Sequence, residues 1–428
     1  MNKTGSFIHE VQKRPLLRPL IFWIAGILLQ ICFPLQKVSF VFIIMAGMAL
    51  LLSFALPQKN NDAFFYDYRW AWGVFFACIV VFLAIQTTHL TEQRLKKPQE
   101  TGFLLGKAQE MQTKMVSKLG DLHLPDEEKA VLATLTVNYR KAMTASLRNR
   151  FSVTGISHLL AVSGFHVGIV SAFISILLSF FSQKKVASRW IKFVLTLVGV
   201  WTFTYLSGLA TAAVRAAIMI TIYMTGSVLG RSPDKYNTLA GAAFCMLVYN
   251  PFYLFDVGFQ LSFTAVFFIL YLQPGLSRLI EIRNPLIANP WSVITVTIAA
   301  QTGTSFLCFF YFGQSSMVFL FTNLALSLMA TILIPATLIW MITPSSLPGI
   351  DIIRFFVETM TRWFMSVVDR FASIPGATLS LRFDFATLVF SYLFLAFILM
   401  YFRSRRYGML ITSLVTLLVM ICWQLIKK

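Results

Sequence analysis

The sequence predicts an all-α, polytopic membrane protein, and three observations lead to this fold class. Of the 428 residues, 57% are hydrophobic and only 12% are charged. Apolar runs recur along the chain at about the 20-residue length that an α-helix needs to cross a bilayer. These runs lack the alternation of apolar and polar residues that membrane β-strands show, and backbone groups in lipid must pair within their own segment, so the runs predict helices.

We expect roughly eleven or twelve hydrophobic helical segments, some of them broken or re-entrant. A run at residues 237–249 is shorter and weaker than the others. The clear runs cover residues 20–35, 38–56, 70–90, 156–181, 190–207, 209–229, 253–272, 291–311, 316–342, 385–402 and 407–426.

The positions of these runs divide the chain into parts of different character. They are an N-terminal three-span region (1–91), a polar helical insertion (92–155), a transmembrane core (156–343), an amphipathic helix and loop (344–384) and a C-terminal two-span region (385–428). If the basic N-terminus stays inside, three spans place the insertion outside. Continuing the count puts Arg403, Arg405 and Arg406 outside, against the positive-inside rule, so either one segment is re-entrant or the region 343–384 is external.

The formal net charge of +19 has two explanations that composition does not separate. Basic residues hold loops on the cytoplasmic side of a membrane. They also line paths for polyanions, whose phosphates need neutralising where water is scarce. The same two interpretations apply to the cations that end the insertion, either a basic collar at a channel mouth or a solvated helix face: Arg140, Lys141, Arg148 and Arg150.

The segment 351–371 predicts an amphipathic helix. Asp351, Arg354, Glu358, Arg362 and Asp369 recur at helical spacing, while aromatic residues occupy the other side. Such a helix lies in the membrane interface or caps a bundle.

The run at residues 156–181 carries unusual polar residues, and polar groups in hydrocarbon are costly enough to mark function. His158, Ser163 and His166 interrupt it, and Gly164 and Gly168 form a G-x-x-x-G step. That step is typical of tight helix packing. Beside a serine and a histidine it could equally mark a helix break that turns backbone groups toward a cavity.

Further polar residues lie inside later runs. Arg215 cannot lose its charge, so we expect a carboxylate or a wet cavity beside it. Asp256 is the acidic residue well inside a run, with Gln260 one turn further on the same face. We therefore expect Arg215 and Asp256 to approach each other or a shared cavity, as a functional site or as a buried structural pair. Asn323 is a further polar residue, in a span that contains Pro335.

Signatures of enzymes are missing from the sequence. Residues 102–108 resemble a P-loop but are one residue short between the glycines and lack the Ser/Thr that holds magnesium. No metalloprotease, nucleophile-elbow or two-metal acidic motif occurs. We expect no catalytic residue, no metal site and no cofactor.

Four motifs occur in order over roughly two thirds of the chain. They are a Leu-Pro-acidic helix start at residues 124–128, the sequence T-G-x-S-H-L-L-A-V-S-G-x-H-V-G at 154–168, T-A-A-V-R-A at 211–216, and N-P followed by F-D-V-G-F-Q-L-S-F at 250–263, with Asn323 further on. In these motifs the chain closely resembles the ComEC-type competence proteins.

The resemblance implies a function and a set of partners. ComEC-type proteins are inner-membrane channels through which bacteria import single-stranded DNA during natural transformation. The resemblance therefore implies a multi-pass protein of the bacterial inner membrane whose partners are single-stranded DNA, membrane lipid, a DNA receptor outside, and a cytosolic translocase or strand-binding protein inside. The residues around the path or its packing centre would be His158, Ser163, Gly164, His166, Gly168, Arg215, Asp256, Gln260 and Asn323, with Arg140, Lys141, Arg148 and Arg150 on the DNA backbone.

Two departures from the family pattern matter. Residues 92–155 are too few for the external OB-fold of many members plus two helices, and no metallo-β-lactamase-like domain follows the last run. The resemblance thus implies the channel module alone. A secondary transporter for a small anionic solute and a non-conducting membrane scaffold are the alternatives, and the sequence does not define the oligomeric state, the pore width or the strand polarity.

Overall fold

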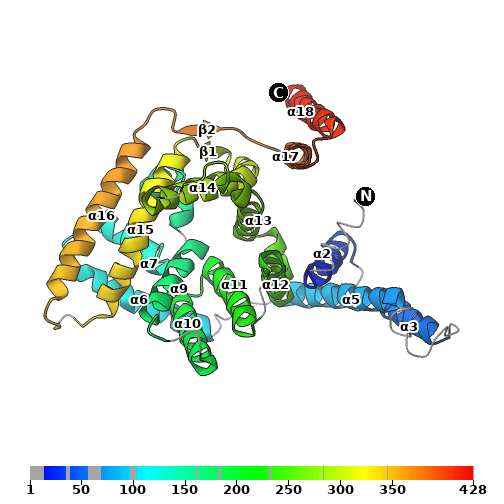
Figure 1. Cartoon of the computed structure of the whole chain (residues 1–428), viewed down its shortest axis with the longest axis horizontal. Helices are drawn as coiled ribbons and strands as arrows, with labels where there is room; N and C mark the ends of the chain where they lie inside the picture. The colour runs from blue at the N-terminus through cyan, green and yellow to red at the C-terminus, as the bar shows by residue number, and fades with distance from the viewer. Residues whose placement is uncertain are drawn as a thin grey trace. The chain divides into compact units, whose positions relative to one another are not determined.

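The described part of the chain folds almost entirely into helices (Figure 1). The computed structural model describes residues 14–34, 39–55, 69–96, 103–160, 162–181, 185–230, 234–282, 284–344 and 346–427. The chain divides into unit 1, which is Met1–Met111 with Val170–Phe263, and unit 2, which is Gln112–Ile169 with Thr264–Lys428. The predicted fold class, an all-α polytopic membrane protein, is confirmed.

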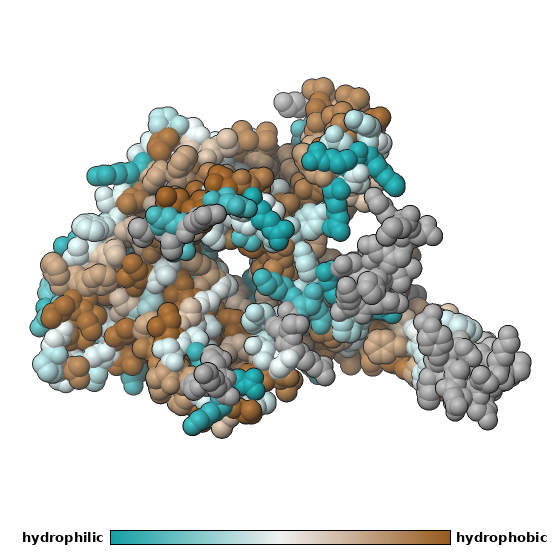
Figure 2. All heavy atoms as spheres, viewed as in Figure 1, coloured by the Kyte–Doolittle hydropathy of each residue, from teal (hydrophilic) through white to brown (hydrophobic). Residues whose placement is uncertain are grey.

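Eight helices of the described residues are long and apolar enough to cross a membrane, and three shorter apolar helices accompany them. Many of their apolar side chains lie on the surface, for example Ile411 of the last helix, which is 61% exposed. Figure 2 shows this apolar surface at the C-terminal helices, at the upper right of the view. Side chains of this kind are suited to lipid rather than to water.

Unit 1 is a group of apolar helices around one small core. Its α5 packs against both α2 and α3, and α12 packs against α2 and α11. The buried core includes Trp23, Ile27, Ala84, Leu247 and Phe259. The elements are α2 (Leu17–Cys32), α3 (Phe40–Ala55), α5 (Arg69–Leu95), α10 (Val186–Leu206), α11 (Thr211–Val228), α12 (Lys235–Tyr249) and the 3₁₀ helix η4 (Pro251–Phe255), while α6 (Phe103–Ser117), α9 (Gly164–Leu177) and α13 (Val257–Ser277) have residues in both units.

Gly26 allows α2 and α5 to approach closely. A Cβ atom at this position would lie 2.6 Å from the Ala84 Cβ and 2.8 Å from the Val81 carbonyl oxygen. We expect Gly26→Ala to force the two helices apart, with a loss of about 1–3 kcal/mol of stability that is measured by thermal unfolding in detergent. Gly73→Ala in α5 is the control, since a Cβ there meets nothing within 4 Å. Equal unfolding temperatures for the two variants would contradict this packing.

Unit 2 is built on α7, α15 and α16, which share the larger core. Residues Ala130 to Val137 of α7 are all buried, and they pack with Leu333 of α15 and with Phe364 of α16. The elements are η2 (Lys118–Asp121), α7 (Asp126–Val137), α8 (Ala145–Val153), η3 (Ser157–Leu159), α14 (Pro285–Phe312), β1 (Gln314–Ser316), α15 (Phe319–Ile342), α16 (Ile350–Ala372), β2 (Thr378–Ser380), α17 (Phe385–Ser404) and α18 (Tyr407–Lys427).

A two-stranded sheet closes the α15–α16 pair. β1 and β2 are antiparallel, with Gln314 opposite Ser380, and the Met317 amide donates to the Ala377 carbonyl at 2.7 Å. The sheet therefore holds the start of α15 beside the end of α16. In agreement with the sequence, α16 is amphipathic: Val357, Phe364 and Val368 are buried, whereas Ile352, Phe355 and Trp363 are exposed.

Two segments differ in detail from the expected helices. The run at 156–181 is divided into η3 and α9 instead of forming one helix, and the second helix of the insertion is two helices, α7 and α8, separated by Asn138 in the left-handed conformation. Residues 103–108 of the P-loop-like segment belong to α6 and form no loop. The insertion is also less solvated than its composition indicates, because its α7 lies in the core.

Candidate functional site

The polar residues of the 154–168 motif gather at a break between helices in unit 2. α8 ends at Val153, and Gly155 turns the chain at φ +78°. The Ile156 amide donates to the Phe151 carbonyl at 3.1 Å, and the Leu159 amide to the Ile156 carbonyl at 2.8 Å. After η3 the chain enters α9 at Gly164. We call His158, Ser163, Gly164 and His166 the helix-break cluster.

His166 holds the start of α9 from inside the protein. Its imidazole is fully buried, and its Nδ1 accepts the Ser163 amide at 3.2 Å and contacts the Ser163 Oγ at 3.1 Å. A backbone N–H only donates, so Nδ1 carries no proton and the neutral ring is protonated on Nε2. Among the described residues Nε2 has no hydrogen-bond partner. The histidine therefore satisfies an amide at the helix start that would otherwise be unpaired.

The other residues of the motif are placed differently. His158 and Gly164 are exposed, and Ser163 is half-buried. A Cβ at Gly168 would meet nothing within 4 Å, so among the described residues the G-x-x-x-G step marks no close helix contact there.

α15 is tied to the helix break at its first turn. The Thr322 hydroxyl donates to the Thr154 carbonyl at 2.7 Å, and a Cβ on Gly155 would collide with Ser316 and Phe319. Asn323, the next residue of α15, is buried, and its Oδ1 has no hydrogen-bond partner among the described residues. The predicted site residues His166 and Asn323 are thus both buried polar groups of unit 2, while Arg215, Asp256 and Gln260 belong to unit 1.

The Arg215 cluster of unit 1 consists of Arg215, Asp256 and Gln260. Arg215 lies in α11 with its side chain only 5% exposed, and its Nη1 is 4.0 Å from the Asp256 Oδ1. Asp256 precedes α13, where its Oδ1 accepts the Phe259 amide at 2.7 Å. Gln260 turns back onto η4 and donates to the Leu254 carbonyl at 3.0 Å. The arginine is therefore buried beside a carboxylate that already caps a helix.

The basic residues at the end of the insertion separate into two kinds. Arg140, Lys141 and Arg148 are exposed. Arg150 instead bonds to Glu127 and to Asp369, the latter at 2.8 Å. The guanidinium of Arg150 thus joins α7, α8 and α16, which leaves the three exposed cations better placed for a ligand.

Sequence reasoning missed a second set of contacts between the insertion and α16. The His123 amide donates to the Glu358 Oε1 at 2.8 Å, and Arg362 donates to the His123 carbonyl at 2.9 Å. The recurring charges of α16 were the only sequence feature that indicated these contacts. They predict a polar helix face, but they do not show which residues that face contacts.

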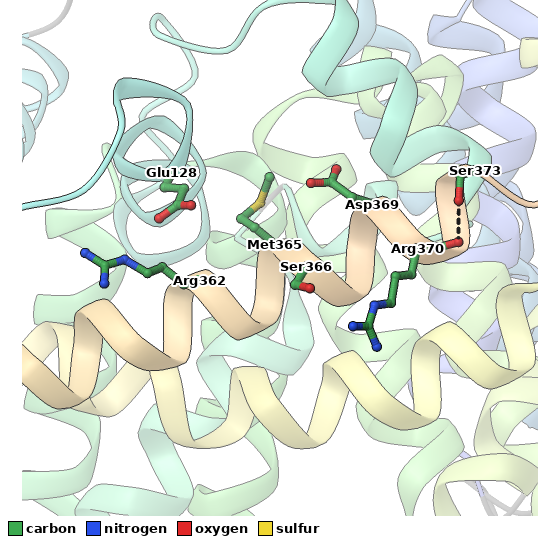
Figure 3. A pocket seen from close by; sticks show the side chains of 7 residues that line it. All are labelled: Glu128, Arg362, Met365, Ser366, Asp369, Arg370 and Ser373. Carbon is green, nitrogen blue, oxygen red and sulfur yellow. Dashed lines mark hydrogen bonds between the residues drawn. The ribbon is translucent and has the colours of Figure 1, made fainter.

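A polar hollow of about 420 Å³ lies beside these contacts in unit 2. Figure 3 shows Glu128 of α7 opposite the α16 residues that line it. Glu128 and Asp369 balance Arg362 and Arg370 in charge, and Asp369 also bonds to Arg150. A lining with equal numbers of both signs does not favour a polyanion.

The pH dependence of stability tests whether the Glu128 carboxyl is partly buried at this hollow. Burial raises the pKa of its carboxyl, while Arg362 opposes that shift. The folded protein then binds this proton more tightly than the unfolded chain, so stability is lost as the pH rises from the unfolded pKa to the folded pKa. We expect Glu128→Gln to unfold at a higher temperature than the unsubstituted protein at pH 8, with a smaller difference at pH 4. Glu110→Gln, at an exposed position, is the control. A lower unfolding temperature for Glu128→Gln at pH 8 would contradict the argument.

No group of three or more His, Cys, Asp or Glu residues suited to a metal ion occurs in the described parts of the chain. What the two clusters offer is hydrogen bonding and fixed charge.

A comparison with known protein families covers the part of the chain that contains both clusters. The model of the competence protein family matches residues 135–406, well over half of the chain. The chain belongs to the competence protein family. The matched region contains the helix-break cluster, the Arg215 cluster and α16, and it begins after α2, α3 and α5.

Two curated relatives of this competence protein match part of its length. ComE operon protein 3 of Bacillus subtilis (strain 168) is 31% identical over 203 residues, which are 46% of this chain and 24% of that protein. An uncharacterized protein of Aquifex aeolicus (strain VF5) is 28% identical over 194 residues, 45% of this chain and 42% of that protein. The alignments thus cover less than half of either relative. No solved structure matches the chain.

Proposed function

We propose that the chain is the membrane channel module through which single-stranded DNA crosses the bacterial inner membrane during natural transformation. The observation that carries the proposal is the contact between Ser163 and the buried His166 in the helix-break cluster, at the broken start of an apolar helix within the region that matches the competence family. Polar groups at such breaks provide contacts for a polar substrate in an otherwise apolar segment.

The cost of moving DNA phosphates toward a negative interior means that this channel needs partner proteins to drive transport. Moving each phosphate toward a negative interior costs about 2.3 kcal/mol for every 100 mV crossed. The P-loop-like residues 103–108 are helical, so they form no phosphate loop to drive transport. Direction must then come from a cytosolic translocase or strand-binding protein, with a DNA receptor outside. The exposed Arg140, Lys141 and Arg148 would meet the DNA backbone.

The test is DNA uptake in naturally transformable cells whose only competence channel is this chain. We expect cells that lack it to bind labelled DNA at the surface but to admit none to the cytoplasm, and the restored chain to return uptake of one strand. Normal uptake without the chain, with related genes also deleted, would contradict the proposal.

A secondary transporter for a small anionic solute is the second candidate. A single buried arginine beside a carboxylate, as in the Arg215 cluster, is the observation that favours it. Proteoliposomes separate the two functions: exchange of a small anion that single-stranded DNA does not inhibit would favour the transporter.

A further inference from the structure

The guanidinium of Arg215 lies against the first turn of α13. Besides the 4.0 Å approach to Asp256, its Nη2 and Nη1 atoms are 3.6 and 3.8 Å from the position that a Cβ on Gly258 would occupy. Gly258 is the second residue of α13. The absence of a side chain there leaves room beside both the guanidinium and the helix start.

This arrangement concentrates positive charge in one place. In the first turn of the 21-residue α13 the Phe259 and Gln260 amides are bonded to Asp256, so the Val257 and Gly258 amides are the ones without an intrahelical partner at the positive end of the helix dipole. A second positive group, the buried guanidinium, faces the same turn. Arg215 cannot be neutralised by losing a proton, so the two groups repel unless an anion lies between them.

Asp256 neutralises this charge only in part. The 4.0 Å separation from Arg215 is longer than a hydrogen bond, and the Arg215 Nε has no hydrogen-bond partner among the described residues. The same Asp256 oxygen is held by the Phe259 amide at 2.7 Å. The Asp256 side chain is also 47% exposed, so it can be displaced from the arginine without leaving a buried charge. The buried guanidinium has N–H donors without hydrogen-bond partners in the described part of the chain and lies next to the backbone amides of a helix start. Donors of these two kinds bind phosphate, and a guanidinium can bind it in a bidentate manner.

We infer that the first turn of α13 and Arg215 form a binding site for the phosphodiester group of single-stranded DNA, with Asp256 as the internal anion that the phosphate displaces. This inference rests on the proposed function and adds a defined contact to it. A permanent phosphate site would stop a moving strand. A carboxylate that returns after each phosphate keeps the contact short-lived.

The test measures binding of a fluorescent oligothymidylate to the purified full chain in phosphatidylcholine nanodiscs at several salt concentrations. We expect Arg215→Ala to weaken binding about 10-fold and to reduce the dependence of log affinity on log salt by about 0.7, the value for one phosphate contact on a single strand. Arg215→Lys should retain the salt dependence but recover only part of the affinity, because lysine lacks the two-pronged geometry.

Asp256→Asn distinguishes this site from a structural ion pair. Removal of the competing anion should tighten oligonucleotide binding by about 3-fold to 10-fold, since the phosphate no longer has to displace a charge. A structural pair predicts the opposite result: Arg215→Ala and Asp256→Asn would both lower stability and would weaken binding alike. A gain in affinity cannot come from misfolding, so this variant keeps the inference testable even if Arg215→Ala is poorly folded.

Gly258→Ala provides an independent test, because its Cβ would lie 3.1 Å from the Asp256 Oδ1 and fill the space beside the guanidinium. We expect it to weaken oligonucleotide binding. Gly275→Ala, in the same helix with nothing within 4 Å, should leave binding unchanged.

The inference is overturned if wild-type binding is intact yet Arg215→Ala and Asp256→Asn leave it unchanged. It is also overturned if, in nanodiscs that contain phosphatidylglycerol as well, Arg215→Ala loses the bound phosphatidylglycerol while it keeps the oligonucleotide. Absence of any oligonucleotide binding or uptake by the wild type would instead contradict the proposed function.

Discussion

Replacing Gly155 by alanine should destabilise the protein by about 2–5 kcal/mol, because two penalties coincide at this residue. The backbone has φ +78°, a conformation that costs an L-residue roughly 1–2 kcal/mol. The new Cβ would lie 2.7 Å from the Ser316 Cβ and 2.9 Å from the Phe319 Cβ, where overpacking costs a further 1–3 kcal/mol or so. The amount of protein in the membrane and its thermal unfolding in detergent measure the effect.

Gly376→Ala is the matched control for Gly155→Ala. Gly376 also belongs to unit 2 and has φ +72°, but a Cβ there meets nothing within 4 Å. It therefore carries the backbone penalty without the collision, and its effect should be about 1–2 kcal/mol. Equal effects of the two substitutions would show that the contact between Gly155 and the β1–α15 segment is not formed in the protein.

Substitutions of His166 should separate according to which ring nitrogen the new side chain imitates. Asparagine keeps an acceptor near the Nδ1 position, which receives the Ser163 amide, whereas glutamine imitates Nε2. We expect His166→Asn to retain most DNA uptake. His166→Gln and His166→Leu should reduce uptake about 10-fold to 100-fold, since a buried amide left unpaired costs roughly 1–3 kcal/mol at the start of α9. Transformation frequency at matched protein levels gives the measurement.

Ser163→Ala serves as the mild variant in this series. It removes the hydroxyl contact of 3.1 Å but leaves the Ser163 amide to donate to Nδ1. A small loss of uptake is expected. The reverse order, with His166→Gln active and His166→Asn inactive, would mean that Nε2 is the functional atom and that the histidine does more than hold the helix break.

The sequence was sufficient for features that a single periodicity defines. Long apolar runs predict the membrane helices, and the charges at 351–369 predict the amphipathic α16, because lipid and interface each impose one pattern on a helix. A helix break beside Gly164 and Gly168 was one of two alternatives, but these glycines do not reveal whether a helix continues through them. The hydrogen bonds of Ser163 with the His166 imidazole give the physical reason for the break.

Long-range partners could not be predicted in the same way. Arg150 is one of several cations near the end of the insertion, and its sequence position does not show that Glu127 and Asp369 lie on either side of it. The burial of α7 was also missed, because its first turn is acidic and the apolar part that follows is only a short run. These contacts depend on which helices pack together. By contrast, an arginine and an aspartate inside apolar runs were enough to predict that Arg215 and Asp256 approach each other.

The most direct test of the central claim is photo-crosslinking during DNA uptake. Phe165 lies between Gly164 and His166 at the helix break and is 37% exposed, so this aromatic position has a solvent-facing part that can take the larger p-benzoylphenylalanine. Phe402, 60% exposed on α17, is the control position. The proposed function predicts adducts with labelled single-stranded DNA at position 165 and few at position 402. Adducts with lipid alone at both positions, in cells that are importing DNA, would contradict it.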